Sequence, residues 1–184
     1  MARNSDFSWS LRLFLRVYQR QIRFFLRFAI FFLLMNFIYF LLADTFIQDF
    51  IFSSLTAKPA AAIIQFMSPG DGIWVTGNLL VSRYTSLRII HGCEGVQCML
   101  VITSAILAYK TSAMHKLAGV LCGVAFLYAV NLLRIVGVYF VVKYDRSALE
   151  VAHHYVGQTF VIMMMFAFFI IWVRRKIDGQ ERTD

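Results

Sequence analysis

Proline and acidic side chains are scarce in this chain of 184 residues, which has 2 prolines and 10 Asp and Glu residues against 18 Lys and Arg. Only 15% of the residues are charged, whereas 60% are hydrophobic. A soluble domain carries about half apolar residues. The shortage of charge therefore argues against a soluble domain. Because the apolar residues come in long blocks, we expect an integral membrane protein.

Cysteine is also rare, and its distribution argues against a disulfide-stapled secreted fold. There are 3 cysteines, an odd number, and Cys122 lies in the middle of an apolar run. The net charge of +8 does not indicate nucleic-acid binding, since the basic residues lie next to the apolar blocks. Orientation in the bilayer explains them more simply, and membrane lipids are the partners that they predict.

Four apolar stretches are expected to cross the bilayer as helices. They are residues 24–43, 95–109, 117–138 (with a possible extension to 142) and 155–173. The first stretch matches a hydrocarbon core of about 30 Å at about 1.5 Å per residue. The expected fold class is therefore an all-α polytopic membrane protein with about four transmembrane helices.

Two further segments are expected to lie beside these helices rather than to cross the membrane. Residues 6–23 carry Arg12, Arg16 and Arg20 at intervals of four, so the arginines share one helical face. This segment is either a helix on an anionic membrane surface or a positive flank of the first span. Residues 57–67 are apolar but too short to span, and we expect them in the interface or packed on the bundle.

Residues 69–92 have a different character and predict a small β element. Two β-prone runs, 73–76 and 79–82, flank the dipeptide Gly77-Asn78, which favours a hairpin turn. Residues 87–91 could add a third strand. This element leads directly into Cys93.

Basic residues divide the chain into three parts and predict its orientation. Residues 1–23 form a basic segment, residues 24–173 a membrane-embedded domain, and residues 174–184 a basic tail. The two ends and the loop at 110–116 carry most of the Lys and Arg, so we expect these parts on the cytoplasmic side. The hairpin element and Cys93 then face the exterior.

This orientation brings three kinds of polar side chain to one membrane face. Cys93 begins the second span, Arg134 lies near the outer end of the third, and His153 and His154 begin the fourth. A thiol just before a helix N-terminus has a stabilised thiolate, which is the species that attacks a carbonyl carbon. The alternative is that Cys93 is a small apolar residue at a helix start.

The other polar residues fit the roles that a cysteine nucleophile requires. Placing a charge such as that of Arg134 inside a membrane costs roughly 2.5–3.5 kcal/mol. Arg134 could offset this cost by binding an oxyanion or a carboxylate. The alternative is that its side chain snorkels toward the outer headgroups. Asn131, one turn earlier, could orient it. One of the two histidines would be the general base, unless both are ordinary interfacial residues. Glu94 could pair with Arg134 or His153, but we expect it to favour the helix N-terminus.

The remaining thiols and histidines are expected to be accessory. Cys98 is predicted to be a packing residue, Cys122 a core residue, His91 accessory or neutral, and His115 too far away on the cytoplasmic side.

The pattern Cys93-Glu94-Gly95, Asn131-x-x-Arg134-Ile135 and His153-x-x-x-Gly157 resembles the exosortase/archaeosortase family over residues 70–173. The resemblance implies a bacterial cytoplasmic (inner) membrane protein with both termini cytoplasmic. Such a protein is a cysteine transpeptidase or protease that processes substrates bearing a C-terminal motif, a transmembrane helix and a basic cluster.

By this resemblance Cys93 forms an acyl-thioester, Arg134 stabilises the oxyanion or donates a proton, and His153 rather than His154 is the base. No cofactor or metal is implied. The acceptor would be water, a lipid or a glycan carrier. The chain departs from the family in carrying Glu94 where Ser is frequent, and in having fewer spans than many members.

Three other functions compete with this one. A four-helix thiol oxidoreductase coupled to quinone would use Cys93 and Cys98, although two thiols five positions apart on a helix are poorly placed for a disulfide. A metal or haem protein would use His91, Cys93 and one of the outer histidines, without an ordered ligand spacing. A non-catalytic assembly factor would make Cys93 incidental.

Overall fold

The structure is a computed structural model that describes residues 3–42, 50–90, 92, 94–145, 147 and 156–181, with side chains described between residues 18 and 175. Four helices form the main body: α1 (Arg3–Leu41), α4 (Val96–Ala108), α5 (Ala113–Tyr144) and α6 (Gln158–Glu181). Within the described residues, three segments are long and apolar enough to cross a membrane, namely Tyr18–Leu41, Ala113–Tyr144 and Gln158–Arg175. The expected class, an all-α polytopic membrane protein, is confirmed.

Helix α4 is shorter than the other three, with 13 residues. At about 1.5 Å per residue it covers only about 20 Å of a hydrocarbon core of about 30 Å. It nevertheless lies between α1 and α5 and contacts both. The second of the four expected spans is thus a helix of the bundle that is too short to cross a bilayer of ordinary thickness by itself.

Helix α1 is a single element of 39 residues that continues through the expected boundary between residues 23 and 24. No glycine or proline occurs between Arg3 and Leu41, so nothing in the sequence interrupts the helix. The span Tyr18–Leu41 has 0% of its most apolar stretch buried, and its main neighbour is α4. Most of its apolar surface is therefore left for lipid.

Helix α5 packs against both α4 and α6, and α4 also contacts α6, so these three helices pack on one another. Glycine makes the approach of α6 possible. A Cβ atom added at Gly119 would collide with the Trp172 ring, and one at Gly123 would lie 2.9 Å from Phe168 Cε1. Small residues that let helices approach closely are a common device in membrane bundles.

The predicted hairpin is confirmed, with strands β1 (Trp74–Thr76) and β2 (Leu79–Val81) pairing antiparallel around the turn at Gly77, whose φ is +58°. A third strand, β3 (Ser86–Arg88), pairs antiparallel with β2. It begins one residue before the expected range 87–91 and ends at Arg88. Beyond Arg88 the contact with the hairpin turn continues, because the Ile89 N–H donates to the Asn78 carbonyl at 2.8 Å while the Ile89 side chain, 2% exposed, enters the core.

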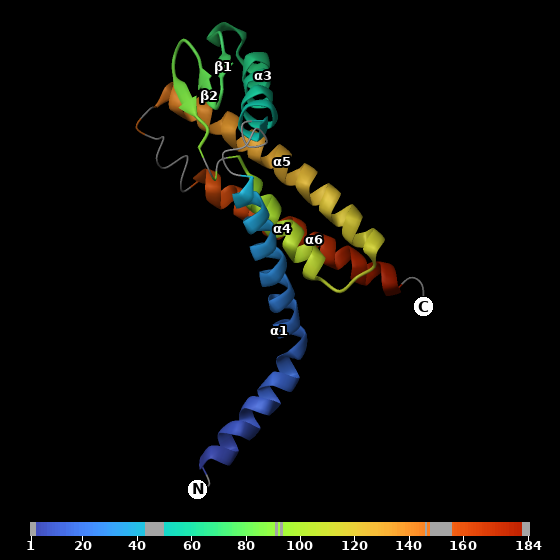
Figure 1. The fold of residues 1–184 in the computed structure, drawn as a ribbon. Coiled ribbons are helices and arrows are strands. Elements are labelled where there is room, and N and C mark those ends of the chain that lie inside the picture. The colour runs from blue at the N-terminus through green and yellow to red at the C-terminus, as the bar shows by residue number, and fades with distance from the viewer. Residues whose placement is uncertain are drawn as a thin grey trace.

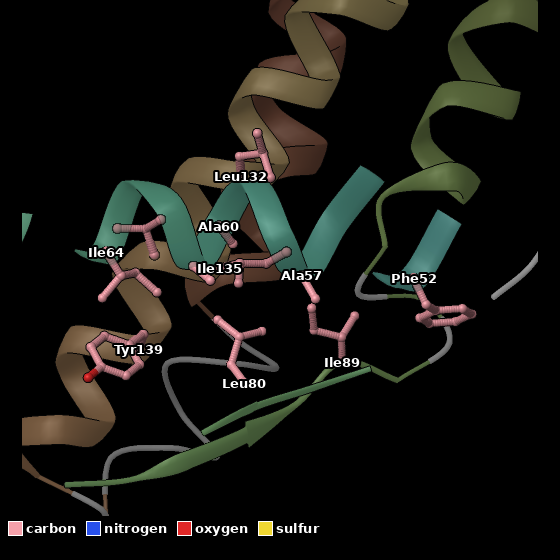
Figure 2. Close-up of a cluster of buried hydrophobic side chains, with 11 residues drawn as sticks. Phe52, Ala57, Ala60, Ile64, Leu80, Ile89, Leu132, Ile135 and Tyr139 are labelled. Carbon is pink, nitrogen blue, oxygen red and sulfur yellow. The ribbon is translucent and has the colours of Figure 1, made fainter. Parts of the chain in front are cut away.

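Residues Ile51–Ala57 form a π-helical segment, and α3 (Lys58–Met67) follows it directly. Both pack on the bundle rather than standing apart. Figure 2 shows their side chains in one cluster with β2, Ile89 and α5. Ala57, Ala60 and Ile64 are each 0% exposed in this cluster. Of the two expected positions for residues 57–67, in the interface or packed on the bundle, the structure shows the second.

The two ends of the bundle differ (Figure 1). At one end lie the sheet, α3 and the C-terminal part of α5. At the other lie the loop between α4 and α5 and the C-terminal part of α6. The rings of Tyr109, His115 and Trp172 join these last elements, with His115 stacked on Trp172 at 4.8 Å.

Candidate active site

The expected catalytic side chains are described only in part. Cys93, His153 and His154, together with His91, lie outside the described residues. Of the expected triad, the structure places Arg134. It also places the neighbours that sequence analysis assigned to the same face, which are Glu94, Gly95 and Asn131.

The turn that opens α4 lies directly against α5. Gly95 is the N-cap residue of α4 and has a φ of +81°, a conformation that favours glycine. A Cβ atom added there would lie 2.7 Å from Asn131 Cγ, so only a residue without a side chain fits. Asn131 itself is 2% exposed. The Glu94-Gly95 turn and the Asn131 side chain, predicted to share one membrane face, are therefore brought together.

Arg134 lies one helical turn beyond Asn131 and faces the protein interior. It is 8% exposed, whereas its neighbour Leu133 is 60% exposed. The adjacent Leu132 and Ile135 belong to the cluster that joins α5 to α3 and the sheet. A guanidinium that snorkelled to headgroups would be on the exposed side of α5, so burial of Arg134 argues against that alternative.

Glu94 is buried by a contact that sequence reasoning missed. It is 3% exposed, and its Oε1 accepts a hydrogen bond of 2.9 Å from the hydroxyl of Tyr39 near the end of α1. Its Oε2 has no hydrogen-bond partner among the described residues. Glu94 was expected to act on the helix N-terminus. The structure instead ties it to α1, and a tyrosine inside an apolar span was the only sequence signal for this contact.

A second polar contact fixes the sheet end of the bundle. Lys143, in the last turn of α5, forms an ion pair of 2.7 Å with Asp71, and the Tyr139 hydroxyl donates to the same carboxylate at 2.8 Å. Asp71 is 3% exposed. The hydrogen bond from the Lys143 ammonium holds the pKa of Asp71 below its ordinary value against the opposing effect of burial, with Tyr139 adding to it. These bonds hold the turn that leads into the hairpin.

The other expected residues fall as follows. Cys98 packs beside the cluster of Ile102, Ile106 and Leu127, in keeping with a packing role. The expectation that Cys122 is a core residue is wrong, because its side chain is exposed on α5. His115 lies about 28 Å from Arg134 along α5 at about 1.5 Å per residue. Within the described part of the chain, no group of His, Cys, Asp or Glu could hold a metal ion.

Comparison with known families gives one finding. The family model described as Transmembrane exosortase (Exosortase_EpsH) matches residues 8–173, which is most of the chain. No curated protein and no solved structure matches the chain significantly.

Proposed function

Because the chain belongs to the transmembrane exosortase family, we propose that it is a membrane-embedded cysteine transpeptidase or protease that cleaves the C-terminal sorting signal of translocated proteins. Membership of the family supports a membrane transpeptidase or protein-sorting role in general. The finer proposal is that Cys93 carries the reaction as an acyl-thioester, with Arg134 and His153 as its partners.

One observation carries this proposal: the Glu94-Gly95 turn is packed on Asn131, one turn from the buried Arg134. Cys93 is joined by a single peptide bond to Glu94. The backbone at Gly95 thus lies against the part of α5 that carries a buried, permanently charged guanidinium, and this supports the proposal that the neighbouring residue Cys93 reacts there. A buried guanidinium with no function is costly in a membrane helix, which supports a catalytic task.

The proposed chemistry has two halves. In the first, His153 takes the thiol proton, the Cys93 sulfur attacks the scissile carbonyl carbon, and Arg134 stabilises the resulting oxyanion. The intermediate collapses, the C–N bond breaks, and His153 returns the proton to the leaving amine. In the second half, water, a lipid hydroxyl or a glycan carrier attacks the thioester, and the thiol of Cys93 is released with its proton.

The substrates would be proteins that end in a short motif, a transmembrane helix and a basic cluster. We place the protein in the bacterial inner membrane, and the distribution of Lys and Arg supports an orientation with both termini in the cytoplasm. In that orientation the Cys93 end of the bundle faces the periplasm. This can be tested with a membrane-impermeant maleimide on whole cells, in a variant that lacks Cys98 and Cys122. Failure to label Cys93 from outside would contradict the orientation.

The central experiment is to trap the acyl-enzyme. The full chain is purified with a candidate substrate and digested, and mass spectrometry is used to find a substrate fragment on the peptide that contains Cys93. We expect the adduct in the wild type, none in Cys93→Ala, and a strong reduction in Arg134→Ala. An adduct that persists in Cys93→Ala would overturn the proposed nucleophile.

Cys98→Ser is the matched control, because it removes a thiol from the same helix region. A transpeptidase should keep its activity in this variant. A thiol oxidoreductase that cycles between Cys93 and Cys98 would lose it, and that loss would favour the rival function.

A further inference from the structure

A basic pocket lies at the end of the bundle opposite the sheet. It has a volume of about 800 Å³ and is formed between α1 and the end of α4. Four cationic side chains line it: Arg20, Arg23 and Arg27 from α1 and Lys110 from the loop after α4. Its volume is within the range of about 300–1,000 Å³ that is typical of small-molecule sites.

The pocket exists because two neighbouring helices have different lengths. Helix α4 ends at Ala108, whereas α1 continues past it toward its N-terminus, as Figure 1 shows. The side chains of Arg20, Arg23 and Arg27 recur at intervals of three and four residues, so they lie along one face of α1. That face meets the space left beyond the end of α4.

No acidic side chain lines the pocket. The two segments that form the pocket also carry none near it, since the sequence contains no Asp or Glu between Asp6 and Asp44, or between Glu94 and Asp145. Four like charges around one hollow repel each other, and an anion bound among them would relieve that repulsion. Arginine is especially suited to phosphate, because its planar fork donates two parallel hydrogen bonds.

The apolar surface around the pocket favours a membrane lipid over a soluble anion as its ligand. Phe24, Phe25 and Tyr109 contribute aromatic surface to the same lining. Along α1, the pocket is continuous with exposed apolar side chains, including Phe25 at 65%, Leu26 at 56% and Ile30 at 61% exposure. A phospholipid can place its phosphate among the cations and its acyl chains along this surface, whereas a free phosphate leaves that surface uncovered.

We propose that this pocket binds the headgroup of an anionic membrane phospholipid and that the lipid joins α1 to the end of α4. Such a lipid would add to the contact that α1 already makes with α4, since the span of α1 has 0% of its most apolar stretch buried inside the protein. The proposal is independent of the chemistry at Cys93.

The test uses the full chain purified in a neutral detergent, with native mass spectrometry and thermal unfolding as readouts. We expect added phosphatidylglycerol to remain bound and to raise the unfolding temperature. Phosphatidylcholine and inorganic phosphate at the same concentration should do neither. The pocket variant Arg23→Gln/Arg27→Gln should bind phosphatidylglycerol roughly 25-fold more weakly, given about fivefold for each charge.

Two further variants make the result specific. Arg174→Gln/Arg175→Gln removes the same charge from exposed positions near the end of α6 and outside the pocket, and it should bind like the wild type. Arg23→Lys/Arg27→Lys keeps the charge, so it should retain most of the binding if the protein is folded. Equal losses in the two Gln variants would overturn the proposal, since binding would then reflect general charge. Equal binding of phosphatidylcholine or inorganic phosphate, or retention of an acidic protein in place of lipid, would overturn it as well.

Discussion

The hydroxyl of Tyr39 lies 2.9 Å from Oε1 of Glu94, so the end of α1 is bonded to the turn that precedes α4. The two residues are 55 positions apart in the chain. Because Glu94 directly follows the proposed nucleophile, this bond links the least buried helix of the bundle to the candidate active site.

Tyr39→Phe removes this hydrogen bond from Oε1 of the buried Glu94 carboxyl. Neither carboxyl oxygen then has a hydrogen-bond partner among the described residues. We expect the free energy of unfolding to fall by about 1–3 kcal/mol. Substrate cleavage should fall by roughly tenfold, since a misplaced nucleophile can cost as much as about 100-fold. Thermal unfolding in detergent and a cleavage assay measure the two effects.

Tyr128→Phe is the control for this prediction. Tyr128 is a half-buried residue of α5 whose hydroxyl has no hydrogen bond to any of the residues that the structure describes. Tyr128→Phe also removes a hydroxyl oxygen, but it should change neither the free energy of unfolding nor the rate of substrate cleavage. Equal behaviour of the two variants would contradict the role assigned to Tyr39.

Gly95→Ala should disturb the site through backbone and side chain together. The positive φ of Gly95 costs an alanine about 1–2 kcal/mol, and its Cβ atom would lie 2.7 Å from Asn131 Cγ. We expect a loss of stability of more than about 2 kcal/mol and a loss of cleavage. Gly137→Ala is the matched control, because a Cβ atom there has nothing within 4 Å.

A double-mutant cycle separates the two effects. Asn131→Ala in the Gly95→Ala background removes the collisions with Cγ and Nδ2 but leaves the Cβ atom of residue 131 at 3.0 Å and the backbone strain. We expect the combined loss of stability to be smaller than the sum of the two single losses. Simple additivity would show that Gly95 and Asn131 are not in contact.

The local features of this fold could be predicted from the sequence, because their causes are local. The dipeptide Gly77-Asn78 between two β-prone runs predicted the hairpin, and the turn at Gly77 has the positive φ that such turns require. Long apolar blocks predicted three of the four expected spans in the same way, and the second proved to be the shorter helix α4. The cost of a charge in a membrane left two places for Arg134, in the protein or snorkelling to headgroups, and its 8% exposure decides between them.

Contacts between distant residues could not be predicted in this way. Asp71 and Lys143 are 72 positions apart, and no local pattern pairs them. Cys122 shows a related difficulty. Helix α5 carries apolar residues on all its faces, so hydrophobic periodicity could not distinguish the lipid-facing side, where Cys122 lies, from the core. The partners of a side chain within such a helix depend on tertiary packing.

The bond between Lys143 and Asp71 predicts how stability depends on pH. The lowered pKa of Asp71 in the folded state means that its stabilising effect is fully present above the ordinary pKa of 3.8. The effect is lost as the pH falls through the lower, folded value. We therefore expect the wild type to lose stability below about pH 4, and Asp71→Asn to lose less over the same range. Unfolding temperatures recorded in detergent between about pH 6 and pH 2.5 test this, and parallel curves would contradict it.

Arg134→Lys gives the sharpest test of the site, because lysine keeps the positive charge but lacks the planar guanidinium. The guanidinium is 8% exposed on α5, one turn from the Asn131 that packs on the Glu94-Gly95 turn. If its fork binds a developing oxyanion, Arg134→Lys should lower kcat by about 100-fold to 1,000-fold and change KM little. Thermal unfolding, measured on the same sample, should change far less than in Gly95→Ala. A lysine variant with normal kcat would show that only a positive charge is needed, and a collapse of stability would assign Arg134 to the structure rather than to the reaction.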